Sequence, residues 1–223
     1  MSGNFPTSPG PASFALTSKL GTVTGMSESG KRQARLVGGH IWEIRLTYGT
    51  MPQAKWSPMD AFIMLQDGNV DSFDYTYPID NQGTWIDETP VVNGVVSAGA
   101  TSINFDGLTA GVTTIVAGDI FRPDGHDKVY KVVTGGTAGA DSDVLKSDGT
   151  GFILLNDGTS HILMNESRQV TCEVRPAFIE DVADNETLSH TDVQFRMSIK
   201  GVHKFNASAP NFYTYVLDLE ESL

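Results

Sequence analysis

The residues best suited by type and spacing to bind a metal ion form one short polar cluster. Asp124, His126 and Asp127 lie close together in the segment RPDGHDK. Carboxylate oxygens and an imidazole nitrogen are common metal ligands, so this cluster could hold a divalent cation. Its spacing does not match a calcium loop, and Asp124-Gly125 is a frequent turn signal. We therefore favour a polar hairpin turn and expect no bound metal.

No other catalytic constellation emerges from the sequence. Phosphate-binding loops, the nucleophile elbow G-x-S-x-G and the zinc motif H-E-x-x-H are missing, and the histidines are scattered. Paired carboxylates for glycoside cleavage stay open as an alternative, because their pairing depends on the fold. The tryptophans Trp42, Trp56 and Trp85 are more easily placed in a core or an interface. We expect a protein that is not an enzyme and uses no cofactor.

Charge and composition narrow the function classes further. The 223 residues carry a net charge of −12 without a basic arm, so specific nucleic-acid binding is not expected. Such a surface suits a wall that DNA passes without sticking, or it serves solubility alone. The single cysteine, Cys172, cannot form an internal disulfide, and its alternating surroundings predict a small buried residue. Without a signal peptide or an apolar run long enough for a membrane span, we expect cytoplasmic assembly and no membrane insertion.

Alternating side chains predict strands with one buried face. In HIWEIRLTYG, apolar residues point one way and the charged residues between them point the other. One short helix is expected over 57–67, with Ser57 as its N-cap and Pro58 at its first position. The predicted core comprises Trp42, Ile44, Leu46, Phe62, Phe73, Val193, Phe195 and Met197.

A change in composition and strand length along the chain predicts a split domain within a mainly β fold. Between 91 and 165, glycine pairs and Asp-Gly turn signals separate short strand-like runs, including the hairpin candidate FILLNDGTSHILM. We expect an extended N-terminal arm over 1–12 and a β-barrel or sandwich formed by 13–90 and 166–223. The segment 91–165 is then an inserted small all-β module.

Four features follow one another between 29 and 78. They are a strand with the pattern S-G-x-x-Q-x-R (Ser29, Gly30, Gln33, Arg35), a strand with Trp42, a short helix ending at Gln66-Asp67-Gly68, and a strand from Phe73 to Pro78. This order resembles the N-terminal domain of distal tail and tail-tip proteins of long-tailed bacteriophages. The segment AGDIFRPDGHDKVYKVV is similar to inserted domains of phage tail and baseplate proteins, and VRPAF with two aromatic-rich strands completes the pattern.

The resemblance implies a structural virion protein whose β-barrel domain forms a ring, expected to be hexameric, at the distal end of a phage tail. Its partners would be copies of itself, the tail tube protein and the tail-tip or baseplate hub proteins, while DNA passes through without specific binding. Two alternatives stay open. One is a host-surface or glycan-binding tail protein that acts through the inserted module, and the other is a tail terminator or baseplate hub subunit.

A closed ring needs one heterologous contact that repeats around an axis. We hypothesise that basic residues of one subunit meet acidic residues of its neighbour, although each set could equally be an independent solvated surface. The candidate interface residues are Lys31, Arg32 and Arg35 on one side, and Glu180, Asp181, Asp184 and Glu186 on the other.

Overall fold

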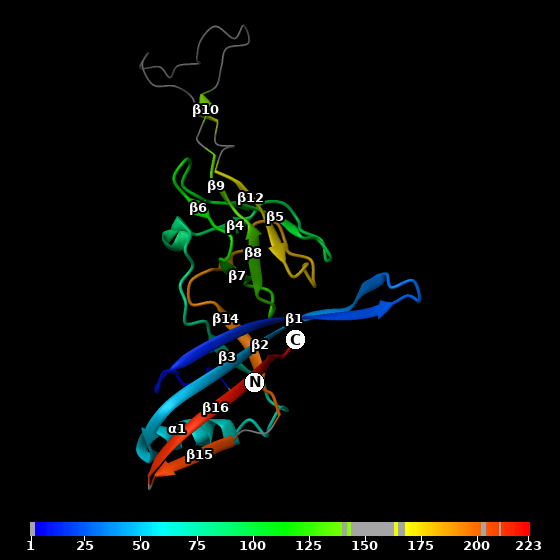
Figure 1. Ribbon diagram of the computed structural model, residues 1–223. Coiled ribbons are helices and arrows are strands. Elements are labelled where there is room, and N and C mark those ends of the chain that lie inside the picture. Colours follow the sequence, from blue (N-terminus) through cyan, green and yellow to red (C-terminus); the bar gives the residue numbers. More distant parts are fainter. Residues whose placement is uncertain (1–2, 140–141, 144–162, 165–167, 202–203, 210) are drawn as a thin grey trace, which may run out of the picture. The chain divides into compact units, whose positions relative to one another are not determined.

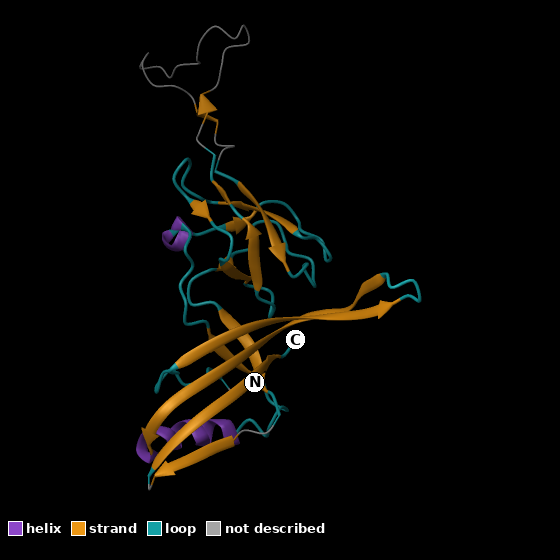
Figure 2. Cartoon of the chain, in the orientation of Figure 1, coloured by secondary structure: helices purple, strands orange, loops and turns teal. Residues whose placement is uncertain are grey.

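The chain folds into two β-rich units. The computed structural model describes residues 3–139, 142–143, 163–164, 168–201, 204–209 and 211–223. Unit 1 consists of Met1–Thr76 with Gln194–Leu223, and unit 2 of Tyr77–Val193. Strands dominate both units, as Figure 2 shows, so the expected mainly β fold with an inserted β module is confirmed. Within these described ranges, no helix is long and apolar enough to cross a membrane.

Unit 1 is built on one antiparallel sheet that nearly closes into a barrel (Figure 1). Its strands run in the order β1 (Ser13–Met26), β2 (Arg32–Pro52), β16 (Phe212–Glu221), β14 (Gln194–Ile199) and β3 (Phe73–Thr76), and β15 (Lys204–Ala209) pairs with β16 as well. The ring of Phe14 on β1 stacks on the ring of Tyr75 on β3, with centroids 6.2 Å apart. The two ends of the sheet therefore approach each other.

The inward face of the strands carries the predicted core. Successive side chains of a strand point to opposite faces, so every second residue is buried in β14 and in the part of β2 from His40 to Tyr48. Phe62 is the exception among the predicted core residues: it is half-buried on a helix, where its ring meets Phe73 edge to face at 5.4 Å. The buried members are Trp42, Ile44, Leu46, Phe73, Val193, Phe195 and Met197.

The helix α1 (Gln53–Met64) starts before the predicted 57–67 and follows β2 directly. Ser57 is not its N-cap, because the Ser57 hydroxyl donates to the Gln53 carbonyl oxygen at 2.9 Å from within the helix. Pro58 also lies inside the helix and not at its first position. The sequence S-P-x-D imitates a helix start, but burial of Trp56 extends the helix towards its N-terminus.

Unit 2 holds a second antiparallel sheet, in the order β13 (Leu188–Ser189), β7 (Ile120–Pro123), β8 (Tyr130–Thr134), β12 (Val170–Arg175), β5 (Ser102–Asp106) and β4 (Val91–Val92). A 3-10 turn spans Thr84–Asp87. Two short pairs join β6 (Thr114–Ile115) to β9 (Gly136–Thr137) and β10 (Ser142–Asp143) to β11 (Leu163–Met164). Its core gathers around Trp85, Phe105, Phe121, Tyr130 and Phe178. Most of the predicted FILLNDGTSHILM hairpin lies outside the described residues.

The boundaries of the inserted unit differ from the predicted 91–165. Strand β12 pairs with β5 and β8, and β13 pairs with β7, so residues 168–193 belong to unit 2. At the other end, Trp85 is part of the unit 2 core. The alternation in β12 shows that one face of the strand is buried, but it does not show which sheet the strand joins. For this reason the sequence pattern placed β12 in the β-barrel or sandwich domain.

The N-terminal segment, predicted as an extended arm over 1–12, is attached to unit 1 at residues 3–5. The backbone N–H of Phe5 donates to the Asp74 carbonyl oxygen at 2.8 Å, and the N–H of Asp74 donates to Gly3 at 3.1 Å. The Phe5 ring is buried and lies 5.4 Å from the ring of Phe73. Burial of this aromatic ring anchors the segment to its own unit.

Candidate functional site

The polar cluster around Asp124 is engaged in hydrogen bonds of the β7–β8 turn. The carboxylate of Asp124 accepts hydrogen bonds from the hydroxyls of Thr187 and Ser189. The ring of His126 is buried, and its Nε2 lies 3.3 Å from the Asp181 carbonyl oxygen. These contacts tie the turn to a later segment of unit 2. In the part of the chain that the structure describes, no group of three or more His, Cys, Asp or Glu side chains could hold a metal ion.

A buried carboxylate that the sequence analysis missed organises another part of unit 2. Asp119 is 1% exposed. Its oxygens accept hydrogen bonds from the backbone N–H groups of Gln82 (2.8 Å), Gly83 (3.2 Å) and Val116 (3.1 Å) and from Nε1 of Trp85 (3.0 Å). A Cβ at Gly83 would lie 2.5 Å from Oδ2 of Asp119, so the close approach requires glycine. The arrangement fixes a loop, and the only sequence signal for it is the Gly118-Asp119 turn.

The single cysteine is a core residue, as predicted. Cys172 is buried on β12 within the unit 2 core. Burial, with a smaller contribution from the charge of Asp119, raises the pKa of its thiol to about 12. The side chain therefore stays a protonated thiol at neutral pH and is a poor nucleophile.

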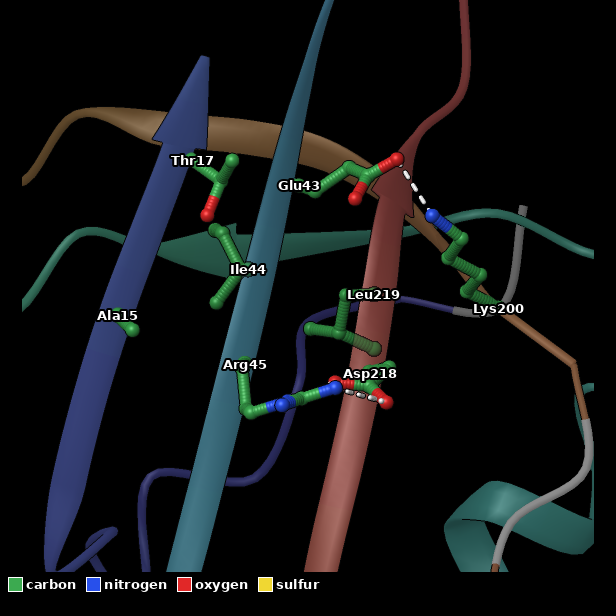
Figure 3. A pocket seen from close by; sticks show the side chains of 8 residues that line it. All are labelled: Ala15, Thr17, Glu43, Ile44, Arg45, Lys200, Asp218 and Leu219. Atoms are coloured by element: carbon green, nitrogen blue, oxygen red, sulfur yellow. Dashed lines mark hydrogen bonds and ion pairs between the residues drawn. The ribbon is translucent and has the colours of Figure 1, made fainter. Parts of the chain in front are cut away.

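The outward face of the unit 1 sheet carries a hollow of about 300 Å³ lined by charged residues (Figure 3). Arg45 on β2 makes two parallel hydrogen bonds to Asp218 on β16, Nε to Oδ1 at 2.6 Å and Nη2 to Oδ2 at 3.1 Å. Glu43 accepts hydrogen bonds from Lys200 and, at 2.9 Å, from Lys19. Figure 3 shows the Arg45–Asp218 and Glu43–Lys200 pairs, with Glu43 and Arg45 on β2 and Asp218 on the neighbouring β16.

The charges of this face are matched among themselves. Hydrogen bonds from Lys200 and then Lys19 hold the pKa of Glu43 below its ordinary value, and the same pairing raises the pKa of Lys200. Asp218 raises the pKa of Arg45. Such exposed pairs stabilise little. The two cations that line the hollow, Arg45 and Lys200, are balanced by its two carboxylates, Glu43 and Asp218, so the lining offers no net charge to a charged ligand.

The strongest candidate for a binding surface is the end of the β1–β2 hairpin, residues 20–37, which we call the hairpin tip. It extends away from the rest of unit 1 (Figure 1). Its apolar side chains are exposed, with Val23 at 61%, Met26 at 78% and Leu36 at 61%. A two-stranded hairpin is marginally stable by itself, and exposed apolar groups clustered together mark interaction sites.

The predicted basic interface residues all lie on this tip and are exposed. In the β1–β2 register, Arg32 is opposite Met26 and Arg35 is opposite Val23, so two of the three cations sit beside apolar side chains. With Lys31 and the single acid Glu28, the tip carries a net charge of +2 in a chain of net −12. The tip therefore differs in sign from the chain as a whole.

The predicted acidic partners lie in unit 2, and most of them accept hydrogen bonds from backbone N–H groups of that unit. Asp181 accepts a hydrogen bond from the N–H of Ala98, and Asp184 from the N–H of Gly94, both at 2.7 Å. Glu186 accepts from the N–H groups of two other residues, Gly125 at 2.9 Å and Ala183 at 3.0 Å. Glu180 is exposed. Three of the four carboxylates thus hold loops in place, which accounts for their position without a partner subunit.

No protein-family model matches the chain, and no curated protein matches it.

Proposed function

We propose that this chain is a structural, non-enzymatic subunit of a bacteriophage tail, which assembles through unit 1 into a ring at the distal end of the tail. The observation that supports the proposal best is the hairpin tip. It projects from unit 1 with apolar and basic side chains exposed together, a combination that is stabilised when another protein surface covers it. The resemblance of residues 29–78 to distal tail proteins supports the same assignment.

The ring would join the tail tube to the tail tip or baseplate and let DNA pass through its channel in the virion. The net charge of −12 is compatible with this passage, because a channel without a basic lining does not hold DNA phosphates. The charge-matched outward sheet face, with Arg45 and Lys200 each beside a carboxylate, likewise offers phosphates no excess of cations. A ring structure with a basic lumen would contradict the proposal.

The first test is the mass of the assembled protein in solution. Size-exclusion chromatography with light scattering over a range of concentrations distinguishes the 24.0 kDa monomer from a closed ring. We expect a discrete species near six times the monomer mass, because closure of a repeating contact stops growth at a fixed number of subunits. A mass that rises without limit with concentration would indicate an open filament and not a closed ring.

A second candidate function is host-surface or glycan binding through unit 2. Exposed Val95, Val112 and Val133 are observations in its favour. Against it, three of the four aromatic residues of the segment 91–165, Phe105, Phe121 and Tyr130, are buried, and the fourth, Phe152, lies outside the described residues. Loss of adsorption by otherwise intact particles that lack unit 2 would favour this candidate.

Imaging labelled subunits in particles would separate the distal ring from a tail terminator or a baseplate hub.

A further inference from the structure

A second exposed apolar surface of unit 1 lies at the end of α1 and in the turn that follows. We call residues 60–71 the acidic turn. Met64, Leu65 and Val70 are exposed there, at 62%, 71% and 78%. Asp60, Asp67 and Asp71 accompany them, and the segment contains no lysine or arginine. The acidic turn therefore combines apolar contact area with negative charge.

The acidic turn is held in one shape before any partner binds. The buried side chain of Gln66 donates to the Phe62 carbonyl oxygen at 3.0 Å. Asp67 and Gly68 both have a left-handed backbone, with φ of 48° and 78°, which reverses the chain tightly. The N–H of Asp71 donates to the Gln66 carbonyl oxygen at 3.2 Å and closes the turn. A preformed surface loses little conformational entropy when it binds.

The hairpin tip and the acidic turn carry opposite charges, and both expose apolar side chains. The tip presents Lys31, Arg32 and Arg35 among exposed Val23, Met26 and Leu36. The turn presents exposed Asp67 and half-buried Asp60 and Asp71 among exposed aliphatic side chains. Apolar burial supplies affinity at such contacts, and opposite charges orient them. In Figure 1 the tip lies well apart from α1 and the turn after it, so one chain does not bring the two surfaces together.

We infer that the hairpin tip of one copy docks on the acidic turn of a second copy, an inference that rests on the proposed ring and names its contact. The two surfaces are different and both belong to unit 1. A contact between two different surfaces is heterologous, and it repeats head to tail until the chain of subunits closes. Each subunit then gives one tip and receives another.

Charge reversal tests the contact from both sides. The tip variant is Arg32→Glu with Arg35→Glu, the turn variant is Asp67→Lys with Asp71→Lys, and Lys55→Glu on the exposed start of α1 is the control. We expect each double variant alone to weaken association about 10-fold or more, as close charge pairs do at other interfaces. The control should associate like the unaltered chain. Light scattering gives the mass, and circular dichroism checks that each variant is folded.

The equimolar mixture of the two variants is the decisive measurement. Glutamate tips then face lysine turns, and arginine tips face aspartate turns, so alternating subunits should regain the mass of the unaltered protein. If both variants associate normally, the inference fails while the proposed ring stands. If only the tip variant loses association, the acidic turn is not the partner and the inference fails.

A cross-link covers the case in which the charge variants lose their fold. Ser29→Cys on the tip combined with Asn69→Cys in the turn leaves all charges in place, and we expect a ladder of disulfide-linked oligomers under a mild oxidant. Each single cysteine variant should give dimers at most. A 24.0 kDa monomer at all concentrations without this ladder overturns both the inference and the ring. Tip-dependent binding to anionic lipid vesicles by such a monomer would assign the tip to a membrane surface instead.

Discussion

Asp119 shows how one side chain holds a segment of unit 2. A carboxylate only accepts hydrogen bonds, so its two oxygens satisfy all the N–H groups that converge on it. An asparagine would present an NH₂ group to some of these donors. We expect Asp119→Asn to lower the free energy of unfolding by about 3 kcal/mol, measured by urea denaturation. Exposed Asp80, changed to Asn, should alter it by less than about 0.5 kcal/mol. Equal losses would contradict the role given to Asp119.

At the scale of single residues, the sequence could predict which side chains are buried, but not which residues they form hydrogen bonds with. Ile44 and Phe195 are buried because the strand period of two places them on the inner face, and that period is visible in the letters alone. Asp119 sits in a glycine-containing turn that looks like any surface turn. Its partner Trp85 is 34 positions away in the chain, a distance that no local pattern spans.

Strand alternation leads to a matched test at the scale of the element. Phe195 on β14 is fully buried, whereas Val216 on β16 is 44% exposed in the same sheet. We expect Phe195→Asp to cost about 3 kcal/mol or more, because the carboxylate is buried without a partner, and to leave the protein unfolded or insoluble. Val216→Asp makes a similar chemical change on the exposed side. It should give a soluble protein with a nearly unchanged thermal midpoint, and a soluble, folded Phe195→Asp would show that the inward face is assigned incorrectly.

The existence of the elements followed from local patterns, while their boundaries and pairings depended on tertiary contacts. The S-P-x-D pattern at Ser57 fitted a helix start, yet burial of Trp56 carried α1 back to Gln53. Likewise, β12 was predicted as a strand but assigned to the wrong sheet. The acidic turn went unnoticed as a surface because exposure of Val70 is decided by the fold and not by its neighbours in sequence.

At the scale of the whole molecule, the position of unit 2 in the chain explains why its insertion does not disrupt the sheet of unit 1. Thr76 on β3 and Gln194 on β14 are register partners, and the N–H of Tyr77 donates to the Val193 carbonyl oxygen at 2.8 Å. Unit 2 therefore occupies the place of a hairpin turn between two neighbouring strands. Insertion at such a place leaves the pairing of the outer sheet intact.

This topology predicts that unit 1 folds and assembles without unit 2. Replacing residues 78–192 by Asn-Gly joins Tyr77 to Val193 through a two-residue turn that suits the twist of antiparallel strands. Since the hairpin tip and the acidic turn both lie in unit 1, we expect the shortened chain to form a ring with the same number of subunits as the full chain. Light scattering of both proteins gives that number. A shortened chain that is folded by circular dichroism but stays monomeric, while the full chain assembles, would place an essential part of the contact in unit 2.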